Sequence, residues 1–135
     1  MKIRPLHRSE IATVLELWKA ADSHPSVTDT VEDVSRILDR EYAAFLVAEI
    51  DGRIVGSIIA TFDGWRGLVY RLAVHPDQRR KGIAGELTKK AEEVFIQWGV
   101  RRVIAIVDST RPHAMGFWKA AGYTNDGMIR FYKNL

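Results

Sequence analysis

The chain has 135 residues, of which 47% are hydrophobic and 27% charged, with a formal net charge of +3. This length and composition predict one globular domain, residues 1–135, and exclude a disordered or fibrous protein. The absence of cysteine excludes disulfide scaffolds, cysteine-bound metals and thiol nucleophiles. No apolar run has the length of a membrane span or of a signal peptide, so we expect a cytoplasmic protein without a membrane partner.

Charge is unevenly distributed along the chain. Residues 1–50 carry six Lys/Arg against nine Asp/Glu, a net charge of −3, whereas residues 71–102 carry eight against four, a net charge of +4. Clustered basic residues attract phosphates, either on nucleic acid or on a nucleotide cosubstrate. Charge alone therefore leaves both kinds of partner open.

The first third of the chain predicts a strand followed by two amphipathic helices. Residues 2–6 alternate as an edge strand does, and Ser9 is expected to cap a helix with apolar residues at positions 11, 14, 15 and 18. After a polar loop, residues 22–29, a second helix is expected from Val31 to near Glu41.

The middle of the chain predicts three strands. Residues 45–50 and 53–62 are rich in β-branched and aromatic types and flank Asp51-Gly52, a strong signal for an antiparallel hairpin. Residues 68–74 are expected to form the next strand, which leads directly into a basic, glycine-containing loop.

The last third predicts two helices and two strands. A long apolar stripe runs from Ile83 to Trp98, and Gly99 stands where a left-handed C-terminal residue is expected. Residues 103–107 predict a short strand buried on both faces, residues 112–121 a helix, and residues 128–133 a closing strand. The element order is that of a mixed α/β fold.

The stretch from Leu72 to Gly85 carries the most chemical information. A strand ends there and a basic loop opens a long helix, whose first backbone N–H groups lack intrahelical partners and lie at the positive end of the helix dipole. Such a helix start accepts an anion, for example a pyrophosphate, and small residues allow close approach. The spacing fits neither a Walker loop nor Gly-x-Gly-x-x-Gly, which argues against ATP and NAD.

At these residues the sequence resembles the GNAT superfamily of acyl-CoA-dependent N-acyltransferases. Arg79-x-x-Gly82-x-Ala84 fits the family's Arg/Gln-x-x-Gly-x-Gly/Ala motif, and residues 117–123 resemble its C-terminal Phe-Tyr-x-x-x-Gly-Phe segment. The resemblance covers essentially the whole chain, and residues 45–49 and 63–67 look most like small bacterial members of the YpeA type. It implies an α/β GNAT fold: a mixed, mostly antiparallel sheet, splayed at the CoA site, with helices on both faces.

The resemblance also implies an activity, namely transfer of an acetyl group from acetyl-CoA to a primary amine, with acetyl-CoA as cosubstrate and no metal. Direct attack in a ternary complex is expected, because the chain has neither a cysteine nor a Gly-x-Ser-x-Gly elbow. In the family, a bulge in the strand before the loop lets a backbone amide, here that of Val74, polarise the thioester carbonyl. The implied CoA-binding residues are Leu72, Ala73, Val74, Arg79, Arg80, Lys81, Gly82, Ile83, Ala84, Gly85 and Trp118.

Two positions depart from the family pattern. Trp118 stands where the family often has a tyrosine that protonates the leaving thiolate, and an indole cannot act as that acid. Arg111 stands where an asparagine is frequent.

The general base is left open, because residues 68–74 contain no carboxylate. Tyr70 and Asp63 are the candidate catalytic side chains. Asp22, His24 and Asp108, or a water relay from one of these groups, are alternatives for the base. The candidates for binding the amine are Asp22, His24, Trp65 and Arg66.

Two other functions remain as alternatives: acyl-CoA binding without catalysis, and a basic nucleic-acid-binding module. The second is disfavoured, because Trp18, Phe95 and Trp98 fall on apolar helix stripes and do not interleave with the basic run. We therefore expect no nucleic-acid partner. The acceptor, a small molecule or a protein, the acyl length, and the choice between monomer and homodimer stay open.

Overall fold

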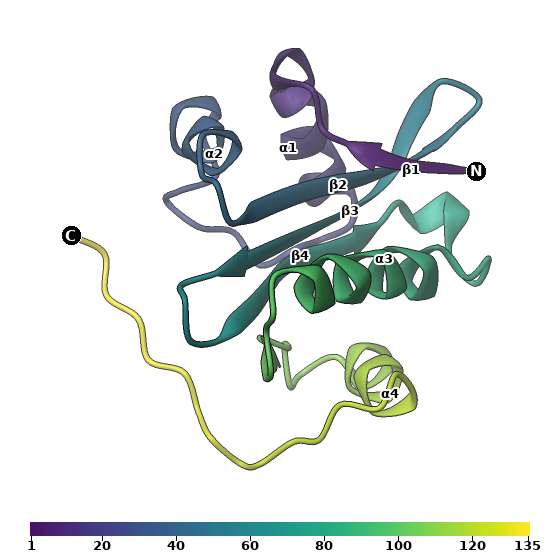
Figure 1. The fold of residues 1–135 in the computed structure, drawn as a ribbon. Coiled ribbons are helices and arrows are strands. Elements are labelled where there is room, and N and C mark those ends of the chain that lie inside the picture. Colours follow the sequence, from purple (N-terminus) through teal and green to yellow (C-terminus); the bar gives the residue numbers. More distant parts are fainter.

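The computed structural model describes all residues, 1–135, and builds five strands into one sheet in sequence order (Figure 1). The strands are β1 (Lys2–Pro5), β2 (Ala43–Ile50), β3 (Arg53–Phe62), β4 (Gly67–Val74) and β5 (Val103–Ala105). The first four pair antiparallel, and β5 pairs parallel with β4 at the sheet edge. The predicted mixed, mostly antiparallel sheet is confirmed.

Helices cover both faces of this sheet. The helices α1 (Ile11–Ala20) and α2 (Val31–Leu38) lie on one face, and α3 (Ile83–Gln97) and α4 (Pro112–Ala120) lie on the other (Figure 1). Short 3₁₀ turns, Arg8–Glu10 and Pro76–Gln78, precede α1 and follow β4. No helix has the length and apolar character needed to cross a bilayer.

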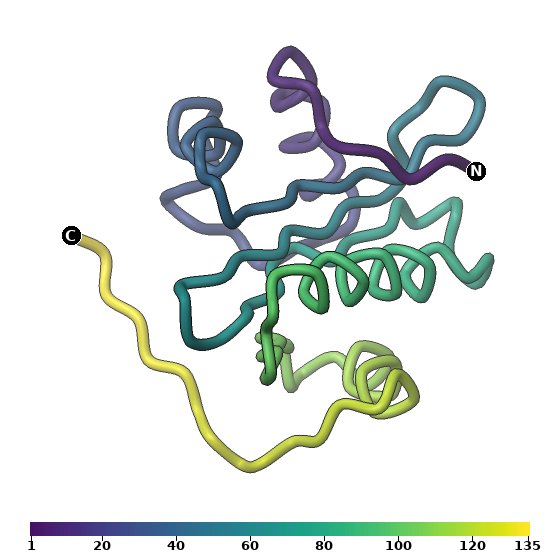
Figure 2. The backbone as a smooth tube through the Cα atoms, viewed as in Figure 1, coloured from purple at the N-terminus to yellow at the C-terminus, as the bar shows by residue number.

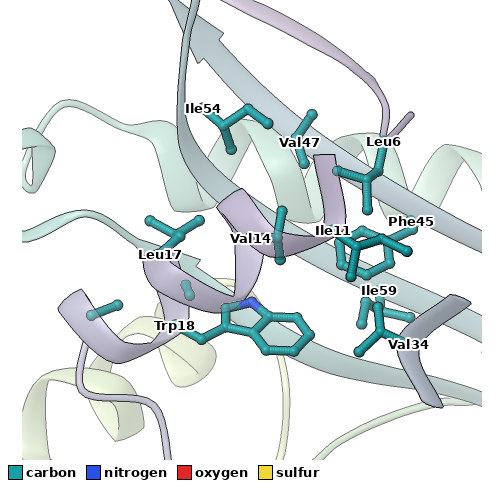
Figure 3. Packing of buried hydrophobic residues seen from close by; sticks show 12 residues of the cluster. Leu6, Ile11, Val14, Leu17, Trp18, Val34, Phe45, Val47, Ile54 and Ile59 are labelled. Atoms are coloured by element: carbon teal, nitrogen blue, oxygen red, sulfur yellow. The ribbon is translucent and has the colours of Figure 1, made fainter. Parts of the chain in front are cut away.

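The two faces give two hydrophobic cores, because successive residues of a strand point to opposite faces. Phe45 and Val47 enter the core beneath α1 and α2, where the Trp18 ring stacks on Phe45 with centroids 6.0 Å apart (Figure 3). Leu46 and Ala48 enter the core beneath α3. The central strands β2 and β3 are therefore buried on both sides, and β4 pairs with β3.

Local turn chemistry produces two further predicted features. Asp51 and Gly52 have φ angles of 49° and 75°, the left-handed conformations that a two-residue hairpin turn needs. Helix α3 begins at Ile83 as expected, and Gly99, with a φ of 78°, follows its end.

Helix boundaries differ from the sequence prediction in two places. Ser9 is not an N-cap but lies within a 3₁₀ turn. The turn forms because the Glu10 carboxylate accepts the His7 N–H at 2.9 Å and pairs with Arg4 at 2.7 Å, which delays α1 to Ile11. Helix α2 ends at Leu38, earlier than predicted.

The C-terminal predictions are wrong in part. Residues 128–133 form no strand and pair with nothing. Strand β5 is shorter than predicted, and its residues are half-buried where we expected burial on both faces. The reason is that no strand covers its outer edge.

Candidate functional site

Strand β5 pairs with only the first three residues of β4. Their register joins Gly67 to Val103, Leu68 to Ile104 and Val69 to Ala105, and pairing stops there. Strand β4 continues to Val74 with β3 on one side only. From Tyr70 onward, the edge of β4 is therefore open in the middle of the fold.

The Val74 amide faces this open edge. The His75 N–H donates to the Val55 carbonyl on β3 at 2.8 Å. Successive N–H groups of a strand point to opposite edges, so the N–H of Val74 points away from β3. An extended ligand lying in the opening would find this donor unpaired.

A bulge lies in β4 just before this donor. Ser57 pairs with Ala73 and Ile59 with Tyr70, so two β4 residues, Arg71 and Leu72, oppose one residue of β3. Arg71 has a φ of 51°, in the left-handed region that non-glycine residues rarely adopt. The bulge implied by the family resemblance is present.

A buried hydrogen-bond chain fixes the bulge. The Ser57 hydroxyl donates to the Arg71 carbonyl at 2.8 Å and accepts the Trp18 indole N–H at 3.0 Å. Ser57 and Trp18 are only 0% and 4% exposed. These buried bonds, between segments far apart in the sequence, hold the strained backbone of β4 in one conformation.

The loop that follows β4 offers a row of free backbone donors. No backbone N–H group from Arg79 to Gly85 donates a hydrogen bond within the protein. Arg80 and Gly82 both adopt left-handed conformations, with φ angles of 62° and 78°. These amides and the dipole of α3 together give the arrangement that an anion needs, next to the open edge of β4.

Three arginines hold the loop between α1 and α2 against this site. Arg71 donates to the His24 carbonyl at 2.8 Å and to Asp29 at 2.7 Å, and its guanidinium lies 4.8 Å from the Trp18 ring centroid. Arg79 donates to the Ala21 carbonyl at 3.3 Å. Arg111 donates to the carboxylate of Asp22 at 3.0 Å.

Two of the predicted amine-binding residues therefore lie beside the bulge. Asp22 and His24 belong to this clamped loop, and both are exposed. The other two, Trp65 and Arg66, lie in the β3–β4 turn, where the Arg66 guanidinium stacks over the Trp65 ring at 4.0 Å. Since β4 has eight residues, that turn lies roughly 20 Å or more from Val74. The structure does not bring these two pairs together.

Asp63 lies in the same distant turn. Its carboxylate accepts the backbone N–H groups of Arg66 at 2.9 Å and Trp65 at 2.8 Å, which hold its pKa below the usual value. Both its distance from Val74 and its lowered pKa argue against a general base.

The remaining candidate side chains differ in placement. Tyr70 is the first β4 residue beyond the β5 pairing, and burial raises its pKa despite the opposing charge of Arg130. Asp108 accepts the Thr110 hydroxyl at 2.6 Å and its N–H at 2.9 Å, and these bonds lower its pKa. Trp118, 8% exposed, packs in the core beneath α3 with its ring 4.7 Å from that of Tyr123.

Sequence reasoning missed the positioning groups, namely Ser57, Trp18 as its partner, and the loop contacts of Arg71 and Arg111. The available signal was Ser57 itself, a polar residue within the apolar run of β3.

Comparison with known proteins identifies this arrangement. Residues 11–123 match the Acetyltransferase (GNAT) family. The chain belongs to this family. The unpaired edge of β4, the bulge and the loop before α3 are thus those of a GNAT acetyltransferase fold.

Solved structures agree with this GNAT fold along the whole chain. AAC(6′)-Iy, in complex with the bisubstrate analogue CoA-S-monomethyl-acetylneamine, superposes with a TM-score of 0.81 at 19% identity, over 99% of this chain and 97% of that one. The aminoglycoside 6′-N-acetyltransferase AAC(6′)-IG from Acinetobacter haemolyticus gives 0.82 at 21% identity, over 100% and 99%. A putative acetyltransferase from Agrobacterium tumefaciens str. C58 gives 0.82 at 14% identity, over 99% and 100%.

At sequence identities of 14% to 21%, the similarity to these structures shows a shared fold and does not identify the acceptor of this protein. Membership of the YpeA-type subgroup stays a prediction.

Proposed function

We propose that this protein transfers an acetyl group from acetyl-CoA to a primary amine by direct attack in a ternary complex. The observation that carries the proposal is the unbroken row of unpaired amides from Arg79 to Gly85, next to the open edge of β4. A CoA pyrophosphate matches the amides, and an extended pantetheine matches the open strand edge.

The reaction follows from the position of the Val74 amide. The amine nitrogen attacks the thioester carbonyl carbon, the oxygen gains negative charge, and the Val74 N–H donates to it. One such donor is worth about 2.7 to 4 kcal/mol. The C–S bond then breaks and the CoA thiolate leaves. With a thiol pKa of about 8.5, this departure needs no acid at the position of Trp118.

The amine approaches from the clamped loop in this proposal. The exposed carboxylate of Asp22 attracts a protonated amine, and His24 lies beside it. The proton released by the amine passes to water or to one of these groups. Tyr70, whose raised pKa keeps its phenol neutral, borders the acetyl position. The cytoplasmic location expected from the sequence stays part of this proposal.

A thiol-release assay with acetyl-CoA tests the proposal across a panel of amines: polyamines, aminoglycosides, amino acids, and peptides with a free N-terminus or lysine. Turnover above the amine-free rate is the expected result, and the amine that gives it defines the acceptor class. CoA binding without turnover on any amine would instead support a binding protein.

Failure to bind CoA, together with oligonucleotide binding that weakens with salt, would instead support a nucleic-acid-binding protein.

A further inference from the structure

Asp22 and Arg111, 89 residues apart in the sequence, are joined by an ion pair. The Nη2 of Arg111 donates both to the backbone carbonyl of Asp22 and to its carboxylate, the latter at 3.0 Å. The Nε of the same guanidinium lies 3.3 Å from the carboxylate of Asp108. The side chain of Arg111 is 29% exposed and that of Asp22 is 90% exposed. The guanidinium therefore lies between two carboxylates, and one of these, that of Asp22, stays open to solvent.

This ion pair joins segments that belong to opposite faces of the sheet. In Figure 2 the chain of α1 (purple) and that of α4 (yellow-green) lie on opposite sides of the strands. Asp22 follows α1, and Arg111 comes directly before α4. The loop that contains Asp22 is also bonded to the bulge of β4 through Arg71. The ion pair thus connects this loop with the segment that follows β5, beside the part of β4 that β5 leaves unpaired.

Asp22 stands where helix physics disfavours an aspartate. The N–H of Asp22 donates to the Lys19 carbonyl at 3.1 Å and that of Ser23 to the Trp18 carbonyl at 2.9 Å, which closes the end of α1. Asp22 has a φ of 56°, at a position where glycine or asparagine is commonest. A negative charge at the C-terminal end of a helix is also unfavourable. The end of α1 gives no reason for a carboxylate here.

Arg111 opposes its own helix in the same way. It is the N-cap residue of α4, and its side chain makes no capping hydrogen bond. Ser, Thr, Asp and Asn are preferred at that position, and a cation at the N-terminal end of a helix is unfavourable. Each of the two charges therefore lies at the wrong end of its helix, which indicates a role other than helix stability.

The loop after α1 does not depend on the carboxylate of Asp22 for its position. Arg71 donates to the His24 carbonyl at 2.8 Å and to Asp29 at 2.7 Å, and Arg79 donates to the Ala21 carbonyl at 3.3 Å. The carboxylate of Asp22 can therefore change its partner while the loop stays in place.

We propose that Arg111 is a specificity-determining residue that competes with the acceptor amine for the carboxylate of Asp22. In the free protein the guanidinium pairs with this carboxylate. A protonated amine replaces the guanidinium there, while the bonds of Arg111 to the Asp22 carbonyl and to Asp108 persist. An uncharged acceptor gains nothing at this position, so the competition favours amines that are protonated at neutral pH. The inference rests on the proposed acetyl transfer.

Two substitutions that break the same ion pair test the competition. The probe is the amine with the highest kcat/KM in the thiol-release panel. Arg111→Met removes the competing cation and should lower the KM for this amine about two- to fivefold, the range that an exposed ion pair permits. Asp22→Asn removes the group for which both cations compete and should raise that KM by a similar factor. The KM for acetyl-CoA should stay within about twofold of the wild type in both variants.

Two further variants serve as controls. In the double variant Asp22→Asn/Arg111→Met, the KM for the amine should equal that of Asp22→Asn alone, because no carboxylate is left to compete for. Arg8→Met breaks another exposed ion pair, that of Arg8 with Asp39, which joins the turn before α1 to the end of α2. It should leave the KM for the amine unchanged.

The direction of the change in KM decides the outcome. An ion pair that only holds the loop is lost equally in Arg111→Met and Asp22→Asn, so a KM for the amine that moves the same way in both variants would overturn the competition. An unchanged KM in Arg111→Met would overturn it as well, and in either case turnover itself would leave the proposed acetyl transfer standing. Absence of turnover with every amine would overturn both proposals together.

Discussion

Gly82→Asp is the sharpest perturbation of the proposed pyrophosphate site. Gly82 has a φ of 78°, and no atom lies within 4 Å of the position that its Cβ would take. An aspartate therefore fits sterically, with a backbone strain of about 1 to 2 kcal/mol. Its carboxylate would stand among the free amides that we assign to the pyrophosphate.

The expected loss of affinity follows from Coulomb's law. Two like unit charges 4 Å apart repel by about 4 kcal/mol at an effective dielectric constant of 20. Since every 1.4 kcal/mol is tenfold, the Kd for CoA should rise about 10³-fold.

Gly99→Asp is the matched control for backbone strain. Gly99 has the same φ of 78° and the same open surroundings, but it follows the C-terminal end of α3. Both variants place a side chain in the left-handed region, but the thermal midpoint should fall less in Gly82→Asp, because a carboxylate is favourable at the N-terminal end of a helix and unfavourable at its C-terminal end. Calorimetric titration with CoA should show the loss of affinity only in Gly82→Asp. A Gly82→Asp protein with a CoA affinity within tenfold of the wild type, or an equal loss in Gly99→Asp, would refute the pyrophosphate site.

Substitutions at three further positions probe other parts of the fold. Trp118→Ala should lower the free energy of unfolding by about 3 to 5 kcal/mol in urea titrations, whereas Trp118→Tyr should change kcat by less than about tenfold, because a thiolate leaves without an acid. Ser57→Ala leaves the Trp18 N–H and the bulge carbonyl unpaired, so it should cost about 1 to 3 kcal/mol of stability and lower kcat; an unchanged urea midpoint would contradict this. Hydrogen bonds with Arg4 lower the pKa of Glu10 to about 2 in the folded protein. The contribution of the Glu10 carboxylate to the free energy of unfolding is therefore complete above the unfolded-state pKa of about 4.5 and is lost as the pH falls through about 2. In Glu10→Gln the free energy of unfolding should therefore change less with pH between 4.5 and 2 than in the wild type. Glu16→Gln, an exposed control, should show the wild-type pH dependence.

The sequence by itself determined the elements whose causes are local. The hairpin follows from Asp51-Gly52, because only residues that tolerate a positive φ form a two-residue turn. The spacing of the apolar stripe predicts helix α3. The first backbone amides of any helix lack intrahelical partners, so the start of α3 supplies free amides after β4. The row of free backbone amides that ends at Gly85 was predictable for this reason, and its use as an anion site stays a proposal.

Tertiary structure alone decided how these parts are positioned. The bulge at Arg71 depends on Ser57 and Trp18, which reach it from two other elements, so no local pattern around Arg71 encodes it. The arginine contacts that bring Asp22 and His24 to the site are of the same long-range kind. Residues 128–133 do not form the predicted strand, because a strand needs a neighbouring strand with which to pair. The residue pattern alone does not say whether the fold supplies that neighbour.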